Sequence, residues 1–552
     1  MAVFGLNKTY TFFSLLIIAA AVIAYYNSFQ GQFLWDDTTL VKNNPALRGG
    51  PGIKSVFTKT IGDTDAPSYF YRPLQLLSYS FDHRLWGFNP VGYHITNLLL
   101  HILTALALFR LVACLFGDRL LAFLTALLFV VHPIHTEAVS YISGRADSLA
   151  LLFMLLCFIC YIRLTGASLY LLTFLTYGLA LLSKEGSIVF PALILLYHVV
   201  FKRKINGKAF LLIITTLSVY LFLRLAVSKS AAIPLSLLAG AWKRTPGFFV
   251  AIAGYLRLLF LPWNLHMEYG NQLFKFSHPQ AIAGVGATIC LIAYAGRRKN
   301  TNPLVSFAVL WFFITLIPVA NIYPPLTFYM AEHFLYVPSV GFFLILGKWF
   351  TQIYSNRQYK IITAGAAILL IIAYCYLTAR QNYYWREPIG FYRQTIKYSP
   401  RSARPYFNLA NEYNQLGRYQ EAVTFYKKAI EIEPQLVNAY NNLGVIYSNL
   451  GKYKEAIISF ETAFAINPEY PDNINNMGIV YFQTGRIEEA INAFEKLLKK
   501  KPGNANAHQY LAALYYKQKK YNLAIKHCDR AAELGSKPTS QFSEDLKKYR
   551  QR

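Results

Sequence analysis

Long apolar runs fill most of the first 380 residues of this 552-residue chain. A helix needs about 20 mostly apolar residues to cross a bilayer, and inside lipid only helices and closed barrels satisfy the polar groups of the backbone. About twelve runs approach this length, at roughly 10–27, 94–116, 118–133, 146–164, 168–183, 187–202, 209–227, 246–262, 279–296, 303–320, 333–351 and 360–379. The sequence therefore predicts an all-α chain whose residues 1–380 form a polytopic membrane helix bundle.

Clusters of Lys and Arg indicate which side of the membrane each loop faces, because such clusters are enriched in cytoplasmic loops. Three clusters, at 202–208, 297–299 and 348–360, are predicted to be cytoplasmic. Three apolar runs separate the first two clusters, whereas an even number must cross. We exclude 246–262, which has Arg257 in its second half and ends at Pro262-Trp263, as an interfacial or re-entrant helix would. About eleven spans remain, with the N-terminus inside and residues 380–552 outside.

Composition argues against two other classes of protein. Charged residues make up 15% of the chain, against about 25% in a typical soluble domain. The net charge of +27 is not accompanied by a recognised nucleic-acid motif, so we expect no nucleic-acid partner. Five of the six cysteines lie in or beside apolar runs, which argues against a disulfide-stabilised extracellular scaffold.

The last part of the chain has a period of 34 residues. Proline recurs at Pro400, Pro434, Pro468 and Pro502, and small residues keep the same step at Ala410, Gly444, Gly478 and Ala512. This period and pattern are typical of tetratricopeptide repeats, which stack into an α-solenoid with an extended concave binding surface. We predict a connector at 381–400, four repeats at 401–538 and a basic tail at 539–552.

With this topology the acidic loops all fall on the outer side: 28–92, 132–145, 183–187, 263–278 and 321–333. An outward-facing active site would produce such a segregation, and a coincidence of helix ends is the alternative. Within the first loop, Asp36 and Asp37 follow Trp35. Paired carboxylates can act as a general base or hold a metal ion. Alternatively, Asp37 caps a following helical turn.

A second group of ionisable residues lies at 132–147. His132, His135 and Glu137 are possible metal ligands, although their spacing lacks the i, i+4 pairing of a helical metal site. Arg145 and Asp147 begin the next span, and one alternative is that they pair with each other. Ionisable groups at the mouths of membrane helices are costly and usually functional.

Further ionisable residues of the outer loops are Arg72, Lys184, Glu185, Glu268, Glu332 and His333. Each alone is compatible with snorkelling or capping. Together they give one outer surface with carboxylates and several cations, which suits a site where a carboxylate removes a proton while cations hold a phosphate-like anion.

Four segments, in this order and followed by the repeats, resemble the family of transmembrane and tetratricopeptide-repeat O-mannosyltransferases over essentially the whole chain: WDD at 35–37, HPIHTEAVSYISGRAD at 132–147, SKEGS at 183–187 and AEHFLYVPS at 331–339. Family members usually have Arg at the position of His333. The short repeat array points to a bacterial relative.

This resemblance implies a C-type glycosyltransferase fold and a sugar, mannose, carried on a polyprenyl or dolichyl phosphate. It implies that Asp36 or Asp37 deprotonates a Ser or Thr hydroxyl of an acceptor polypeptide presented by the repeats. The cations implied to stabilise the leaving lipid phosphate are Arg145, Lys184, Arg72 and His333. The residues implied to orient them are His132, His135, Glu137, Asp147, Glu185, Glu268 and Glu332. Participation of a divalent cation is left open.

The implied location is a bacterial inner membrane with the repeats on the periplasmic side, or alternatively an endoplasmic reticulum membrane with the repeats in the lumen. Two other functions compete with glycosyl transfer. One is a non-enzymatic membrane scaffold that uses the repeats to dock envelope proteins. The other is a transporter, which would place its ionisable residues near mid-membrane and not at the outer mouth.

Overall fold

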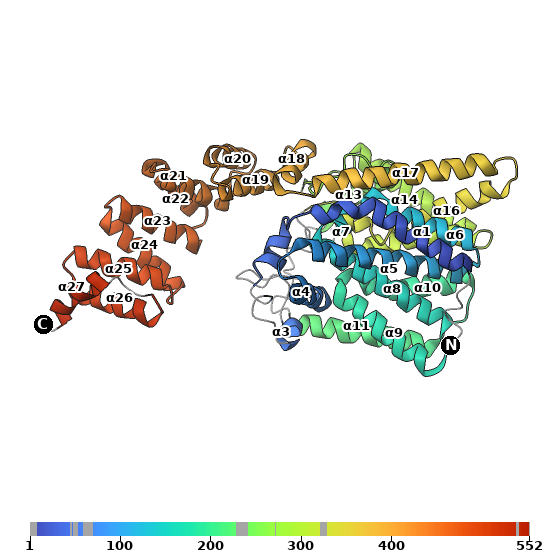
Figure 1. Ribbon diagram of the computed structural model, residues 1–552, viewed down its shortest axis with the longest axis horizontal. Helices are drawn as coiled ribbons and strands as arrows, with labels where there is room; N and C mark the ends of the chain where they lie inside the picture. The colour runs from blue at the N-terminus through green and yellow to red at the C-terminus, as the bar shows by residue number, and fades with distance from the viewer. Residues whose placement is uncertain are drawn as a thin grey trace. The chain divides into compact units, whose positions relative to one another are not determined.

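The computed structural model describes residues 8–44, 47, 53–58, 70–227, 241–270, 272–320, 328–536 and 540–550. Parts of the predicted outer loops 28–92 and 321–333 lie outside these residues. The chain divides into two compact units, Met1–Ser399 and Pro400–Arg552, and the described residues of both contain helices but no strand (Figure 1). The all-α fold predicted from the apolar runs and the 34-residue period is confirmed.

The first unit contains both long helices and short helical turns. They are α1 (Lys8–Tyr25), η1 (Tyr26–Gln30), η2 (Thr38–Lys42), α3 (Ile53–Thr58), α4 (Pro73–Trp86), α5 (Pro90–Phe116), α6 (Arg119–Val131), η3 (Pro133–His135), α7 (Thr136–Val139), η4 (Ile142–Gly144), α8 (Arg145–Arg163), α9 (Gly166–Ser183), η5 (Glu185–Val189), α10 (Phe190–Phe201), α11 (Gly207–Val227), α13 (Ala241–Phe260), α14 (Pro279–Arg298), α15 (Pro303–Leu316), η6 (Ile317–Val319), η7 (Glu332–Leu335), α16 (Ser339–Ser355), α17 (Lys360–Tyr384) and α18 (Pro388–Tyr398).

Seven stretches of helix in the described residues are long and apolar enough to cross a membrane: Lys8–Gln30, Pro90–Phe116, Ile142–Arg163, Gly166–Ser183, Gly207–Val227, Pro279–Arg298 and Lys360–Tyr384. An eighth is possible if α6 and the bent segment Pro133–Val139 form one broken span, and shorter apolar helices cover Glu185–Phe201 and Pro303–Val319. The chain is thus a multi-pass membrane protein, for which the count of about eleven spans is approximate. Helix α13, which the charge pattern excludes from the spans, is not among the seven.

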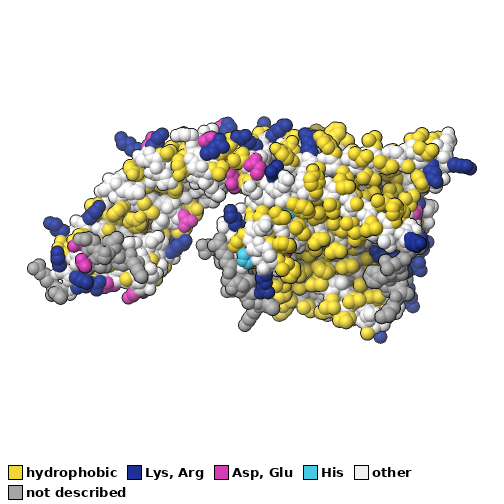
Figure 2. Space-filling model, in the orientation of Figure 1, with side chains coloured by type: hydrophobic (Ala, Val, Ile, Leu, Met, Phe, Trp, Pro, Cys, Tyr) yellow, Lys and Arg dark blue, Asp and Glu magenta, His cyan; other side chains and the backbone are white. Residues whose placement is uncertain are grey.

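The exposed side chains of the first unit are those expected of a surface in contact with lipid. On α17, Ile361 is 87% exposed and Leu369 is 68% exposed, and Figure 2 shows apolar side chains spread widely over this unit. Water would disfavour an apolar surface of this extent, whereas lipid tails are as apolar as the side chains themselves.

The first and last long helices of this unit, α1 and α17, pack against each other. Ala21 and Ala24 of α1 are fully buried, and such small residues let membrane helices approach closely. At one end of this pair, Asn382 Nδ2 donates to the Ala24 carbonyl at 3.0 Å, while Asn382 Oδ1 accepts a hydrogen bond from Ser140 Oγ at 2.6 Å. One amide therefore joins α1, α17 and the turn after α7.

A bend in the chain creates the site described below. Helix α6 ends at Val131, and the following segment continues at an angle of 54°. Pro133 is the first residue of η3, where proline cannot continue the ladder of α6. The turns η3, α7 and η4 therefore fold back within the unit, and the residues of the 132–147 motif are almost all buried.

The second unit consists of four antiparallel helix pairs followed by a terminal helix. They are α19 (Ala403–Gln415), α20 (Tyr419–Ile432), α21 (Val437–Asn449), α22 (Tyr453–Ile466), α23 (Pro471–Gln483), α24 (Ile487–Lys500), α25 (Ala505–Lys517), α26 (Tyr521–Glu533) and α27 (Ser540–Arg550). Gly417, Gly451 and Gly485 have φ between 71° and 75° in the turns within the first three pairs.

Candidate active site

The two aspartates of the first outer loop have different surroundings. The Asp37 side chain is buried. Its Oδ1 accepts hydrogen bonds from Ser143 N at 2.7 Å and Ser143 Oγ at 2.5 Å, and its Oδ2 accepts from Leu34 N at 3.1 Å. Asp36 is exposed, and its backbone N–H donates to Tyr141 Oη at 3.1 Å. Hydrogen bonds therefore hold both aspartates against the 132–147 motif, while the Asp36 side chain remains exposed on the surface.

Helix capping does not explain Asp37. It precedes η2, but its side chain makes no cap hydrogen bond, so that alternative is wrong. Burial raises the pKa of Asp37 to about 7; the hydrogen bonds from Ser143 and Leu34 oppose this shift, and the nearby charge of Asp36 adds to it.

Arg145 is fully buried and lies among partners from α4 and α5. Its guanidinium pairs with Asp82 Oδ2 at 2.5 Å and donates to Asn97 Oδ1 at 2.7 Å and the Tyr93 carbonyl at 3.1 Å. Its Nη1 reaches Ser78 Oγ at 3.2 Å. With its donors turned inward, Arg145 holds α8 against α4 and α5.

Asp147 does not pair with Arg145, which overturns that alternative. Asp147 Oδ1 instead accepts a hydrogen bond from Lys184 Nζ at 2.6 Å, while the adjacent Glu185 accepts from Arg72 Nε at 2.9 Å. Residues 145 and 147 are two apart at the start of a helix, and side chains at i and i+2 do not face each other. The 183–187 segment thus brings two ion pairs together.

Glu137 binds His333, the residue for which the resemblance leads us to expect an arginine. Its two carboxylate oxygens accept from His333 Nδ1 at 2.6 Å and His333 N at 2.8 Å. The neighbouring Glu332 is fully buried, and its Oε1 accepts from His266 N at 2.5 Å and Tyr269 Oη at 2.7 Å. Burial, followed by the charge of Glu137, raises the pKa of Glu332 well above its usual value. This cluster connects the 132–147 and 331–339 motifs.

Among the predicted phosphate-binding residues, three basic side chains are partly exposed: Arg72, Lys184 and His333 are 18%, 12% and 20% exposed. Two of them are close neighbours, because Lys184 Nζ lies 5.9 Å from the ring centre of Phe334, which follows His333 directly. Each of these basic side chains is bound by a carboxylate, from Glu185, Asp147 and Glu137 respectively.

His132 and His135 make contacts that belong to the helix bundle. His132 Nε2 donates to the Leu259 carbonyl at 3.3 Å and its Nδ1 accepts from Ile134 N. His135 Nδ1 donates to the Phe129 carbonyl at 2.8 Å, and its Nε2 lies 3.0 Å from Ser339 Oγ. Among the described residues, no group of three or more His, Cys, Asp or Glu side chains is placed to hold a metal ion.

Several residues of the site were not predicted from the sequence, whereas Glu268 was predicted and directly precedes Tyr269, which donates to Glu332. Glu268 is buried, and its carbonyl accepts a hydrogen bond from Ser399 Oγ. The residues not predicted are Asp82, Asn97, Ser143 and His266. Asp82 could have been found, since an acid next to a membrane span usually has a cationic partner. Ser143 and Asn97 are ordinary polar residues whose partners only the fold reveals.

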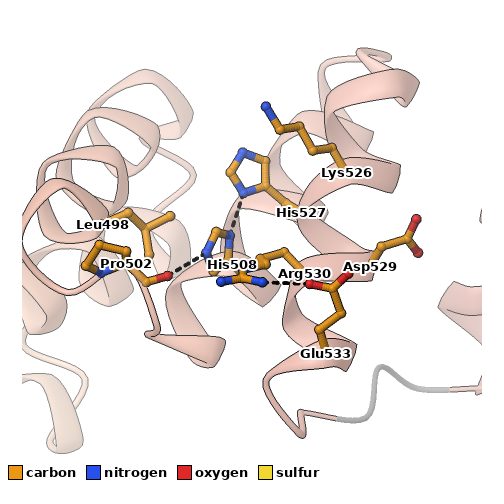
Figure 3. Close-up of a pocket in the computed structure, with 8 residues that line it drawn as sticks. All are labelled: Leu498, Pro502, His508, Lys526, His527, Asp529, Arg530 and Glu533. Atoms are coloured by element: carbon orange, nitrogen blue, oxygen red, sulfur yellow. Dashed lines mark hydrogen bonds and ion pairs between the residues drawn. The ribbon is translucent and has the colours of Figure 1, made fainter.

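A separate pocket of about 550 Å³ lies in the repeat unit, lined by Leu498, Pro502, His508, Lys526, His527, Asp529, Arg530 and Glu533 (Figure 3). His508 Nδ1 and His527 Nδ1 lie 2.8 Å apart, and His508 Nε2 donates to the Pro502 carbonyl at 3.2 Å. Burial, followed by the charges of His508 and Lys526, lowers the pKa of His527 to about 4. None of the predicted site residues lines this pocket.

The repeats match known families. The "TPR repeat" family matches residues 410–451, and two "Tetratricopeptide repeat" families match 437–470 and 475–539. Among solved structures, the crystal structure of MamA is 27% identical over 27% of this chain and 86% of that chain, with a TM-score of 0.26. A Pseudomonas aeruginosa pilF structure is 24% identical over 29% of this chain and 74% of that chain, with a TM-score of 0.28.

Fold and repeats together define a multi-pass membrane protein with a C-terminal tetratricopeptide-repeat unit. Its curated relatives are protein O-mannosyl-transferases of the TMTC type, which confirms the resemblance seen in the motifs. Human TMTC1 is 28% identical over 474 residues, covering 73% of this chain and 53% of the relative. The Caenorhabditis elegans protein F38B6.6 is 25% identical, covering 72% of this chain and 59% of the relative. Mouse TMTC2 is 26% identical, covering 71% of this chain and 59% of the relative. The chain thus spans a little over half the length of these relatives.

Proposed function

We propose that this chain is a membrane glycosyltransferase that moves mannose from a polyprenyl-phosphate-linked donor to Ser or Thr hydroxyls of a polypeptide. The observation that supports this best is the arrangement of the site: an exposed Asp36 beside the buried Asp37, and three partly exposed basic side chains each bound by a carboxylate. The names of the relatives agree with the same class of reaction.

Asp36 is the proposed general base, and Asp37 is the residue that positions it. A base must reach the hydroxyl proton of the acceptor, and Asp36 is the exposed member of the pair. Asp37 is enclosed by Leu34 and Ser143, so its carboxylate fixes the loop. In the reaction, the acceptor oxygen attacks the anomeric carbon as its proton passes to Asp36. The bond between that carbon and the phosphate oxygen breaks, and the lipid phosphate leaves with inversion at the sugar.

Arg72, Lys184 and His333 are the proposed partners of the leaving phosphate, where negative charge grows in the transition state. Lys has three donors and Arg has five, and Lys184 and Arg72 each use one of them in the ion pair described above. Donors therefore remain for phosphate oxygens while the carboxylates fix the cations in place. Arg145 is buried, and we propose that it stabilises the helices that carry these three side chains. His132 and His135 are proposed to do the same.

The acceptor polypeptide is proposed to bind the repeats, and the site and repeats are proposed to face the same, outer side of the membrane. A bacterial cell membrane with periplasmic repeats is our preferred location, with the endoplasmic reticulum and its lumen as the alternative. A lipid-linked donor suits such a site, because the membrane itself presents it.

The test is transfer of labelled mannose from polyprenyl-phosphate mannose to a Ser/Thr peptide by membranes containing the full chain. Asp36→Asn should reduce the rate at least about 100-fold, the usual size of a general-base contribution. The control is Asp118→Asn, the same change at a helix cap that asparagine also fills. Transfer by Asp36→Asn at the wild-type rate would show that another group is the base. Absence of transfer by the wild type would favour the non-enzymatic scaffold.

A further inference from the structure

Arg257 lies on the face of α13 that meets the segment containing Glu332 and His333. One turn before it, a Cβ atom at Gly254 would lie 2.9 Å from Met330 Sδ. One turn after it, the ring centres of Phe260 and Phe342 are 5.0 Å apart. Residues three apart in a helix share a face, so Arg257 is directed at the stretch between residues 330 and 342.

Two hydrogen bonds fix this part of α13 against the 331–339 and 132–147 motifs. Tyr255 Oη accepts from Ala331 N at 3.3 Å, and the Leu259 carbonyl accepts from His132 Nε2 at 3.3 Å. Tyr255, Leu258 and Leu259 are buried in the cluster that also contains Phe334 and Leu335. The backbone that supports Arg257 is thus part of the site's own core.

Unlike the other cations of the site, Arg257 is exposed and forms no ion pair or hydrogen bond with another described residue. It lies within electrostatic range of Glu332 and His266. Glu332 offers little negative charge in return, because burial and Glu137 favour its protonated form. A guanidinium that is exposed and has no carboxylate partner in the described part of the chain is suited to bind a phosphate through two parallel hydrogen bonds.

The surface next to Arg257 is apolar. Phe260, Leu261 and Trp263 follow it and are all exposed. A cation bordered by exposed aromatic and aliphatic side chains fits a ligand that has both a phosphate and a hydrocarbon chain. A free phosphate ion would gain nothing from these side chains.

We propose that Arg257 binds the phosphate of the lipid-linked donor and that the Phe260–Trp263 surface contacts the first part of its hydrocarbon chain. This inference rests on the proposed function, which it deepens by assigning a fourth cation to the donor. Helix α13, which lies outside the set of predicted spans, would then be the element that recognises the donor as a lipid.

The experiment measures binding of labelled polyprenyl monophosphate to the full chain in phosphatidylcholine nanodiscs, alongside mannosyl transfer. Arg257→Gln should weaken binding about tenfold or more, as expected for loss of charge-assisted hydrogen bonds, and Arg257→Lys should restore part of it. Lys243→Gln, which removes an exposed cation from the first turn of the same helix, should bind like the wild type. Unchanged unfolding temperatures would exclude a folding defect.

The outcomes separate this inference from the proposed function. If the wild type binds the lipid phosphate and Arg257→Gln binds equally well, the assignment of Arg257 is overturned and the proposed function stands. If binding depends on Arg257 but no mannose is transferred, the donor-phosphate site stands and the transferase is overturned. If the wild type binds none, both are overturned. Displacement of the ligand by equal amounts of phosphatidylglycerol or inorganic phosphate would assign Arg257 to general anion binding and overturn its donor role.

Discussion

Arg145 and Asp82 form an ion pair across 2.5 Å in which both side chains are fully buried. The pair joins the first turn of α8 to α4, and Asp82 Oδ1 also accepts from Thr96 Oγ1 of α5 at 2.7 Å. Only two residues before Arg145, Ser143 holds Asp37. The position of the aspartates therefore depends on a charge pair that faces away from solvent.

Breaking this pair should destabilise the protein strongly. Asp82→Asn leaves the guanidinium of Arg145 buried without its counter-charge, which typically costs about 3–5 kcal/mol. Thermal unfolding of the detergent-solubilised full chain should show a large fall in the midpoint, while Asp118→Asn should show little change. An unchanged midpoint for Asp82→Asn would mean that Arg145 does not need this partner.

Stability should depend on the protonation of Asp37. Its pKa is about 7 in the folded chain against an ordinary value of 3.8, so folding favours the protonated form. This contribution is present below about pH 3.8 and is lost as the pH rises to about 7, with a slope of at most about 1.4 kcal/mol per pH unit. Between these pH values the unfolding midpoint of the wild type should fall relative to that of Asp37→Asn. Parallel curves would contradict the raised pKa.

The residue at position 333 should tolerate arginine but not alanine. Glu137 can pair with either a histidine or a guanidinium, and arginine offers a phosphate two parallel donors. We expect His333→Arg to transfer mannose within about threefold of the wild type and His333→Ala to raise the KM for the lipid donor about tenfold or more. Equal KM values for the wild type and His333→Ala would remove this residue from the donor site.

The repeat unit should not accept a large side chain at Gly444. A Cβ atom there would lie 2.6 Å from the Phe460 ring, so Gly444→Leu must displace that ring at a cost of about 1–3 kcal/mol. Hydrogen exchange of α21 and α22 in the full chain should accelerate. Lys454→Leu adds a similar side chain at an exposed position of α22 and should leave exchange unchanged. If both variants show the same hydrogen exchange, the close contact with Phe460 does not restrict the side chain at position 444.

The predicted topology can be tested apart from catalysis. A phosphatase that folds only after export, fused after residue 400, should be active. The same enzyme inserted in the basic loop 202–208 should be inactive, since that loop is predicted to stay inside. Activity of the second fusion alone would place the repeats in the cytoplasm.

The sequence predicted the repeats and the membrane helices because both depend on local pattern. Pro434 and Pro468 each follow a helix pair, as a 34-residue step requires, and the apolar runs coincide with helices such as α5 and α17. The excluded run at 246–262 lies in α13, a continuous helix that contains Pro246 and Arg257 and is not among the described helices long and apolar enough to cross a membrane.

Pairing within the site could not be predicted in the same way. Asp37 is bonded to Ser143, 106 residues away, and no local pattern marks that serine. The Arg145–Asp147 alternative failed because the helix directs the two side chains to different neighbours, Asp82 and Lys184. The sequence alone also left Asp36 and Asp37 equivalent, and it is their burial and their hydrogen bonds that distinguish them.

The link from Asn382 to Ala24 spans 358 residues of sequence, and this separation has a consequence for biosynthesis. At a synthesis rate of about 5–20 residues per second, the ribosome needs roughly 20–70 s to make the residues between these two partners. Helix α1 therefore emerges that long before α17. Until then the small residues of α1 lack the helix against which they pack in the folded chain. The loop with Asp36 and Asp37 follows directly from α1, and its Gln32 N–H donates to the Arg386 carbonyl at 3.0 Å. Its contacts with Ser143 and Tyr141 can form earlier, but this one forms only after α17 has been made.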